Sequence, residues 1–206
     1  MQKELSYLAL GDSYTIGELV PPEENFPNQV HRILIEQGIH LAPPRIIAKT
    51  GWTTHELETG ILESGKDEPF KGSYDFVSLL IGVNNQYRGR SVEEYKTEFE
   101  GLLKKAIRFA GNQHNNVVIL SIPDWGVTPF AKDRDSNQIA TEIDAYNAAN
   151  KQIAKDHHIY YIDITPLTRE AADDHTLLTA DGLHPSGKDY QRWAKKVAAF
   201  FMSHIR

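Results

Sequence analysis

Short apolar runs recur along the chain, and longer amphipathic stretches separate them. Each run is rich in β-branched residues and is closed by Gly, Pro, Thr or a polar turn residue, which is typical of a buried β-strand. The predicted strands are Leu5–Leu10, Arg45–Ala48, Tyr74–Ile81, Asn116–Ile122 and Ile159–Ile164. The chain is therefore expected to contain a sheet of buried strands.

The stretches between the runs repeat their apolar residues every three or four positions, which is the spacing of a helix with one buried face. The clearest example begins with Tyr95, Phe99 and Leu102. Ser91 and Glu94 precede it in the order of a capping box, in which the hydroxyl and the carboxylate each bond to an unpaired amide at the helix start. Helices are predicted over residues 26–37, 53–64, 91–110, 139–153 and 186–204.

The alternation of strands and helices predicts the fold class. Each strand is followed by a connection long enough for a helical crossover, which implies right-handed βαβ units and a parallel sheet. We expect an α/β fold of three layers, with helices on both faces of the sheet. Because no linker, repeat or low-complexity tract interrupts the pattern, residues 1–206 are expected to form one domain. Ligands of such sheets bind at the carboxyl ends of the strands, so the residues after each run are candidates for chemistry.

Composition narrows the function classes. The chain of 206 residues has 22 Lys and Arg against 28 Asp and Glu, a net charge of −6, so it lacks the basic surface that nucleic-acid binding requires. It has no cysteine, which excludes thiol nucleophiles, disulfides and thiolate metal sites. Any covalent chemistry must therefore use oxygen or nitrogen.

The start of the chain does not resemble a secretion signal. Glu4 and Ser6 interrupt it, and no apolar run approaches the roughly 18 residues needed to span a bilayer. We therefore expect no integral membrane segment and a cytoplasmic location.

Polar residues follow several of the predicted strands. A Gly-Asp-Ser sequence puts Ser13 after the first strand, at the expected start of a helix, which makes it a candidate nucleophile. Asp181 and His184 could place an imidazole beside its own orienting carboxylate. Asn84 follows the third strand, and Gly51 follows the second, where a glycine leaves a backbone N–H accessible. Each motif alone is compatible with an ordinary turn, but together they fall where a serine hydrolase on an open sheet needs them.

In these motifs the sequence resembles the SGNH hydrolases, also called GDSL-type esterases and lipases. Their conserved blocks supply a serine, a glycine, an asparagine and a histidine in the order found here, and the resemblance covers nearly the whole chain. It implies a flavodoxin-like sheet of five parallel strands. Two positions depart from the common family pattern: Tyr14 replaces the leucine of Gly-Asp-Ser-Leu, and Asn85 replaces the aspartate of Gly-x-Asn-Asp. Neither is a catalytic position in that family.

The resemblance implies a serine esterase that works through an acyl-enzyme. Ser13 is expected to attack the ester carbonyl, His184 to act as the base, and Asp181 to orient the imidazole. The oxyanion hole is expected to comprise the backbone N–H groups of Ser13 and Gly51 and the side-chain amide of Asn84. The expected partner is a small-molecule ester, and no cofactor or metal is expected, because the histidines lack the usual spacing of metal ligands.

The substrate is less well defined by the sequence. Short-chain acyl or acetyl esters are the first expectation, with lysophospholipids and thioesters as alternatives on the same triad. A catalytically silent protein that binds a carbohydrate or a phosphate ligand on this scaffold is the rival from another class. Aromatic residues beside the strand ends either line a substrate pocket or pack in the core and rim: Tyr14, Trp52, Tyr87, Trp125 and Phe130.

Overall fold

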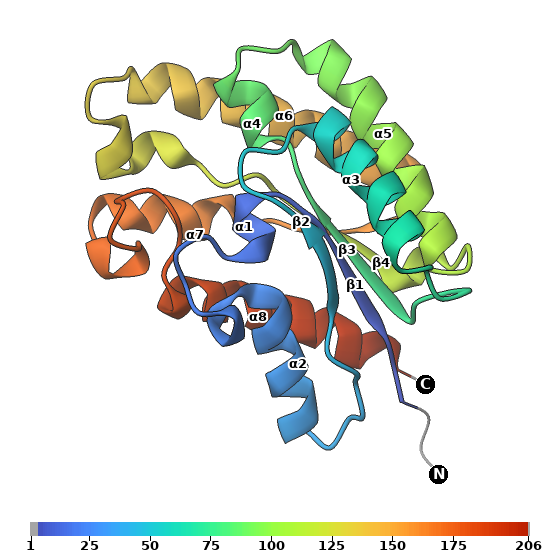
Figure 1. The fold of residues 1–206 in the computed structure, drawn as a ribbon. Coiled ribbons are helices and arrows are strands. Elements are labelled where there is room, and N and C mark those ends of the chain that lie inside the picture. Colours follow the sequence, from blue (N-terminus) through green and yellow to red (C-terminus); the bar gives the residue numbers. More distant parts are fainter. Residues whose placement is uncertain (1–3, 206) are drawn as a thin grey trace.

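The computed structural model describes residues 4–205 and contains one five-stranded sheet (Figure 1). All strand pairs are parallel, and the order is β2-β1-β3-β4-β5. The strands are β1 (Tyr7–Gly11), β2 (Arg45–Ala48), β3 (Phe76–Leu80), β4 (Val117–Leu120) and β5 (Tyr160–Ile162). The predicted α/β class and the flavodoxin-like sheet are confirmed. Several strands are shorter than the apolar runs that predicted them, because the outer residues of those runs lie beyond the paired ladder.

Helices cover both faces of the sheet (Figure 1). They are α1 (Ser13–Ile16), α2 (Phe26–Glu36), α3 (Thr54–Asp67), α4 (Val83–Tyr87), α5 (Val92–Phe109), α6 (Ser136–Asp156), α7 (Thr165–Arg169) and α8 (Gly187–His204). Helices α2 and α8 pack together on one face, and α3, α5 and α6 pack on the other. The three layers expected from the sequence are therefore present.

Side-chain caps fix several helix starts. The Oγ of Ser91 accepts a hydrogen bond from the N–H of Glu94 at 3.2 Å, as predicted. The prediction that the Glu94 carboxylate accepts a hydrogen bond in return is wrong, because that carboxylate pairs with Arg90 at 3.3 Å. A complete capping box occurs instead at the start of α3, between Thr53 and Glu56. A cap of this kind contributes about 1 kcal/mol to stability.

The core holds the sheet rigidly between its helices. Strands β1, β3 and β4 are buried along their whole length. From α8, Phe201 stacks on Phe76 of β3 with ring centroids 4.0 Å apart and meets Tyr7 of β1 edge-on at 4.9 Å. Burial of each such side chain contributes about 1.5–3 kcal/mol to stability.

Among residues 4–205, no helix combines the length and the apolar character needed to cross a membrane.

The topology places a crevice beside β1. The chain leaves β1 for β2 on one side and then returns past β1 to form β3 on the other. The loops that follow β1 and β3 therefore diverge at the carboxyl edge of the sheet, where open α/β sheets bind ligands. The segments with Ser13 and Asn84 follow these two strands.

Candidate active site

Ser13 is the first residue of α1, two positions after the end of β1. Asp12 caps this helix, because its Oδ1 accepts the N–H of Tyr14 at 3.0 Å. Ser13 is only 4% exposed, and its carbonyl accepts the N–H groups of Gly17 and Glu18 at 3.0 and 3.1 Å. Burial raises the pKa of the Asp12 carboxyl to about 7. The backbone around the Ser13 hydroxyl is thus fixed by short-range hydrogen bonds.

His184 and Asp181 form a close pair. The Nδ1 of His184 lies 2.6 Å from Oδ2 of Asp181, and Oδ1 of Asp181 accepts bonds from Thr179 Oγ1, Leu183 N–H and His184 N–H at 2.7, 2.9 and 3.0 Å. Burial alone would raise the pKa of Asp181, but these hydrogen bonds lower it to about 2. Because an ionised carboxylate only accepts hydrogen bonds, the proton of this contact belongs to Nδ1, which leaves Nε2 of the neutral imidazole free to act as a base.

Gly51 lies in the turn after β2, and Asn84 is the second residue of α4. Gly51 has a φ of +83° in a turn closed by a bond from Trp52 N–H to Lys49 O at 3.2 Å, and this positive φ at the third turn position favours glycine. Asn84 follows Gly82, whose φ is +134° and where a Cβ would lie 2.6 Å from the ring of Tyr95. The Nδ2 of Asn84 donates to Trp52 O at 2.9 Å. This bond fixes the direction of the amide and uses one of its two N–H groups.

A crevice of about 190 Å³ brings most of the predicted residues together, although Asp181 and Trp52 do not line it. Besides Ser13, Gly51, Asn84 and His184, it is lined by Thr50, Val83, Leu183, Tyr14, Tyr87, Trp125 and Phe130. Trp125 is buried, and its Nε1 donates to Gln86 Oε1 at 2.7 Å. The rings of Tyr87 and Phe130 lie 5.2 and 6.1 Å from the ring of Trp125. The crevice therefore combines a small polar centre with an aromatic wall.

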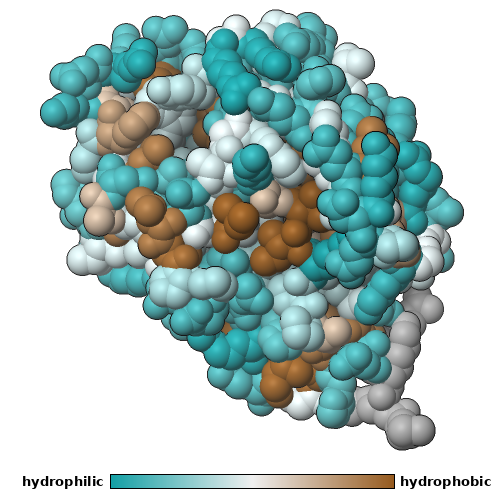
Figure 2. Space-filling model, viewed as in Figure 1, coloured by the Kyte–Doolittle hydropathy of each residue, from teal (hydrophilic) through white to brown (hydrophobic). Residues whose placement is uncertain are grey.

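Hydrophobic side chains also reach the surface near the Ser13 segment. Ile16 of α1 and Leu19 after it are 40% and 60% exposed, and Figure 2 shows several hydrophobic patches on the face of the molecule that it draws. Tyr87 and Phe130 are 48% and 47% exposed at the crevice wall. Part of the aromatic wall of the crevice is therefore exposed at the surface.

Trp52 does not join the other aromatic residues among the described crevice residues. Its ring lies against Gly60 of α3 and packs on the core, so the structure favours the packing alternative for this side chain. Thr50, Val83 and Leu183 also line the crevice but were not predicted from the sequence. Each directly precedes a motif residue, so the motif itself was the signal that could have identified them.

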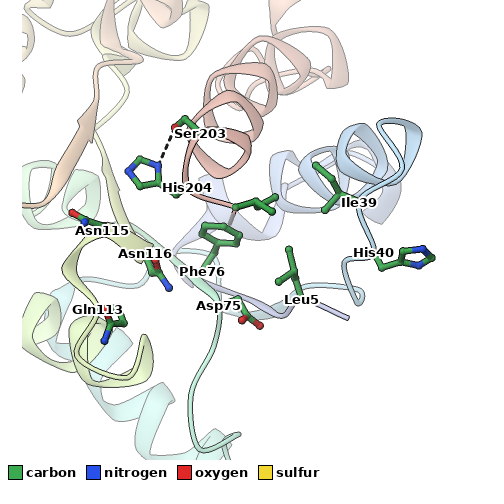
Figure 3. Close-up of a pocket in the computed structure, with 11 residues that line it drawn as sticks. Leu5, Ile39, His40, Asp75, Phe76, Gln113, Asn115, Asn116, Ser203 and His204 are labelled. Carbon is green, nitrogen blue, oxygen red and sulfur yellow. Dashed lines mark hydrogen bonds between the residues drawn. The ribbon is translucent and has the colours of Figure 1, made fainter. Parts of the chain in front are cut away.

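A larger hollow lies at the opposite end of the sheet (Figure 3). It has a volume of about 530 Å³ and includes Phe76, at the amino end of β3. Ser203 lies 2.9 Å from Nδ1 of His204 there, but both side chains also bond to Phe200 O, at 2.7 and 2.9 Å. The two side chains therefore cap the carboxyl end of α8 through their bonds to Phe200 O. Within residues 4–205, no group of three or more acidic, histidine or cysteine side chains is arranged to hold a metal ion.

Comparisons with known proteins agree with the fold and the motifs. A family model described as the GDSL-like lipase/acylhydrolase family matches residues 9–192. Among solved structures, the psychrotrophic esterase EstA from Pseudoalteromonas sp. has a TM-score of 0.72 at 16% identity, with 97% of this chain and 98% of that chain covered. No curated protein matches the sequence.

Two further structures are similar over almost the full chain. A lipase/acylhydrolase from Enterococcus faecalis has a TM-score of 0.72 at 20% identity, with 98% of this chain and 97% of that chain covered. An acetylxylan esterase from Geobacillus stearothermophilus has a TM-score of 0.70 at 18% identity, with 97% and 95% covered. At these identities the structural likeness establishes the shared fold.

Proposed function

This chain belongs to the GDSL-like lipase/acylhydrolase family and is a carboxylic ester hydrolase, and we propose that it acts through an acyl-enzyme on Ser13 with His184 as general base. The observation that carries the proposal is the 2.6 Å contact between His184 and the ionised Asp181, on a crevice that Ser13 also lines. A base held in this way is what an unactivated hydroxyl needs to become a nucleophile.

The proposed reaction has two halves. Ser13 Oγ attacks the ester carbonyl carbon while Nε2 of His184 takes its proton, and the tetrahedral intermediate then releases the alcohol, which takes that proton from Nε2. Water next attacks the acyl carbon while Nε2 takes its proton. The bond between that carbon and Ser13 Oγ then breaks, the acid leaves, and Oγ recovers the proton from Nε2. Asp181 stabilises the imidazolium in both halves and keeps the proton of Nδ1 in place.

The negatively charged oxygen of each tetrahedral intermediate needs hydrogen-bond donors to stabilise it. We assign this role to the backbone N–H groups of Ser13 and Gly51 and to the N–H of Asn84 that Trp52 O does not use. Such donors accelerate the reaction because they meet a charge that develops only near the transition state.

Asn84→Ala is expected to lower kcat by about 100- to 1,000-fold, because it removes one of these donors. KM should change little, since the substrate carbonyl carries no full charge. Initial rates on p-nitrophenyl acetate over a range of concentrations measure both constants. Asn115→Ala, which changes an exposed asparagine in the opposite hollow, is the control. A kcat of Asn84→Ala near that of the control would remove Asn84 from the proposed site.

We propose short acyl chains as the preferred substrates, because the crevice is small. Trp125, Tyr14 and Leu183 line both the crevice and a neighbouring space of about 10 Å³. These three side chains therefore form a partition between the two spaces. On this account the indole of Trp125, held by Gln86, limits the length of the acyl chain.

Trp125→Ala is expected to shift the preference toward longer chains. Each buried methylene contributes about 0.8 kcal/mol, so room for two more methylenes should raise the kcat/KM ratio of octanoate to acetate by about tenfold. A p-nitrophenyl ester series from acetate to octanoate measures this ratio. Phe130→Ala, which shortens a half-exposed wall residue, should change it less. An unchanged ratio in Trp125→Ala would contradict the proposed limit.

A further inference from the structure

The Gly51 turn, residues 49–52, is held against α4 by hydrogen bonds to two of its backbone carbonyls. Nη2 of Arg88, at the end of α4, donates to Gly51 O at 2.6 Å, and Nδ2 of Asn84 donates to Trp52 O at 2.9 Å. The same helix thus carries one proposed oxyanion donor, Asn84, and holds the turn that carries another.

Glu56 fixes the guanidinium that makes this contact. Nη1 of Arg88 lies 3.1 Å from each carboxylate oxygen of Glu56, and Oε2 also accepts the N–H and Oγ1 of Thr53 at 2.8 and 2.9 Å. Burial alone would raise the pKa of Glu56, but these bonds from Thr53 and Arg88 keep it below its ordinary value. Arg88 is therefore oriented by a carboxylate that is itself anchored at the start of α3.

The other flank of the turn is tied to the Ser13 segment. Thr50 Oγ1 donates to a carboxylate oxygen of Glu18, and Glu18 N–H donates to Ser13 O at 3.1 Å. The peptide between Thr50 and Gly51 thus lies between two anchors, Glu18 and Arg88. The N–H of this peptide is the Gly51 donor assigned above.

A contribution to folding stability does not explain these contacts well. Arg88 and Glu56 are 43% and 38% exposed, and ion pairs at such positions contribute about 0–1 kcal/mol. A catalytic donor, in contrast, must stay within about 0.5 Å of its productive position. The positive φ of Gly51 sets the direction of its N–H, but the turn, exposed at residues 49 and 50 and half-buried at 51 and 52, needs outside contacts to set its position.

We propose that Arg88 and Glu18 are positioning residues, which hold the Gly51 N–H at the oxyanion of the reaction. The inference rests on the proposed function, since it concerns the transition state of the Ser13 reaction. It assigns a role in turnover to two charged side chains that do not line the crevice.

The test compares kcat and KM of Arg88→Ala and Glu18→Ala on p-nitrophenyl acetate. Each is expected to lower kcat by about 10- to 100-fold with KM within about twofold, because a displaced donor weakens only transition-state binding. Arg88→Lys, which keeps one donor, and Glu18→Gln, which keeps the acceptor for Thr50, should recover part of the loss. Arg134→Ala, at an exposed arginine before α6, controls for lost positive charge.

A second measurement follows the oxyanion directly. Butylboronic acid bonds to a reactive serine oxygen and leaves a negatively charged tetrahedral adduct, so its Ki should rise in Arg88→Ala by about the factor by which kcat falls. A change in KM alone would make Arg88 a substrate-binding residue and overturn the inference. An unchanged kcat and Ki in Arg88→Ala, with Ser13-dependent hydrolysis by the wild type, would overturn it and leave the proposed function intact. Absence of Ser13-dependent hydrolysis in the wild type would overturn both.

Discussion

Ser13→Ala is expected to lower kcat for ester hydrolysis by at least about 10⁴-fold, because it removes the oxygen that bonds to the acyl carbon. The residual rate would come from the oxyanion donors and from substrate binding alone. Initial rates on p-nitrophenyl acetate and butyrate, after subtraction of spontaneous hydrolysis, measure the effect. The fold should persist, since the helix caps around residue 13 use backbone groups and Asp12.

Ser203→Ala is the matched control for this substitution. Ser203 also lies beside a histidine, 2.9 Å from Nδ1 of His204, but at the opposite end of the sheet. Its removal should leave the rate unchanged. A Ser13→Ala variant with more than a tenth of the wild-type kcat, or a Ser203→Ala variant with a loss as large, would contradict the assignment of the nucleophile.

Asp181→Asn is expected to lower kcat by about 10³- to 10⁴-fold. The amide can retain an oxygen for Thr179, Leu183 and the N–H of His184, but it then presents an NH₂ group to Nδ1 of His184. Nδ1 must become the acceptor, which moves the imidazole proton to Nε2 and removes the base. Rates at pH 7 and 8 measure this effect, and a kcat within tenfold of wild type would remove Asp181 from the mechanism.

The same variant tests the ionisation of Asp181 through stability. Its pKa of about 2 in the fold lies below the value of about 3.9 for an unfolded aspartate. The folded state therefore favours the ionised form, and this stabilisation is present above about pH 4 and is lost as the pH falls toward 2. The wild type should melt at a higher temperature than Asp181→Asn at pH 7, and the difference should narrow at pH 3. A difference in melting temperature that is the same at pH 7 and pH 3 would contradict the lowered pKa of Asp181.

The alternation of apolar runs and amphipathic stretches was sufficient to predict the layers of the fold, because buried parallel strands such as β1 and β3 are apolar throughout. The flavodoxin-like sheet of five parallel strands came from the family resemblance, since periodicity carries no information on which strands pair. The error at Glu94 has a local cause: Arg90 offers its carboxylate a charged partner that the capping pattern does not consider.

Side-chain placement across the crevice was harder to predict. The motifs identified the polar centre because Ser13, Gly51 and Asn84 lie two to four residues after the ends of β1, β2 and β3, whose carboxyl ends meet at one edge. Trp52 also follows a strand, yet its ring turns toward α3. The contact between Arg88 and Gly51 joins residues 37 positions apart, and no local pattern marks such a pair. The cytoplasmic location stays a prediction from the sequence.

The most direct test of the account is the site of reaction with a fluorophosphonate, which bonds to an activated serine oxygen with loss of fluoride. One label per chain is expected, on the peptide that contains Ser13, and ester hydrolysis should fall in proportion to the fraction of chains labelled. Full hydrolytic activity after complete labelling, or the absence of any label at Ser13, would contradict the account and favour a silent binding protein on this scaffold.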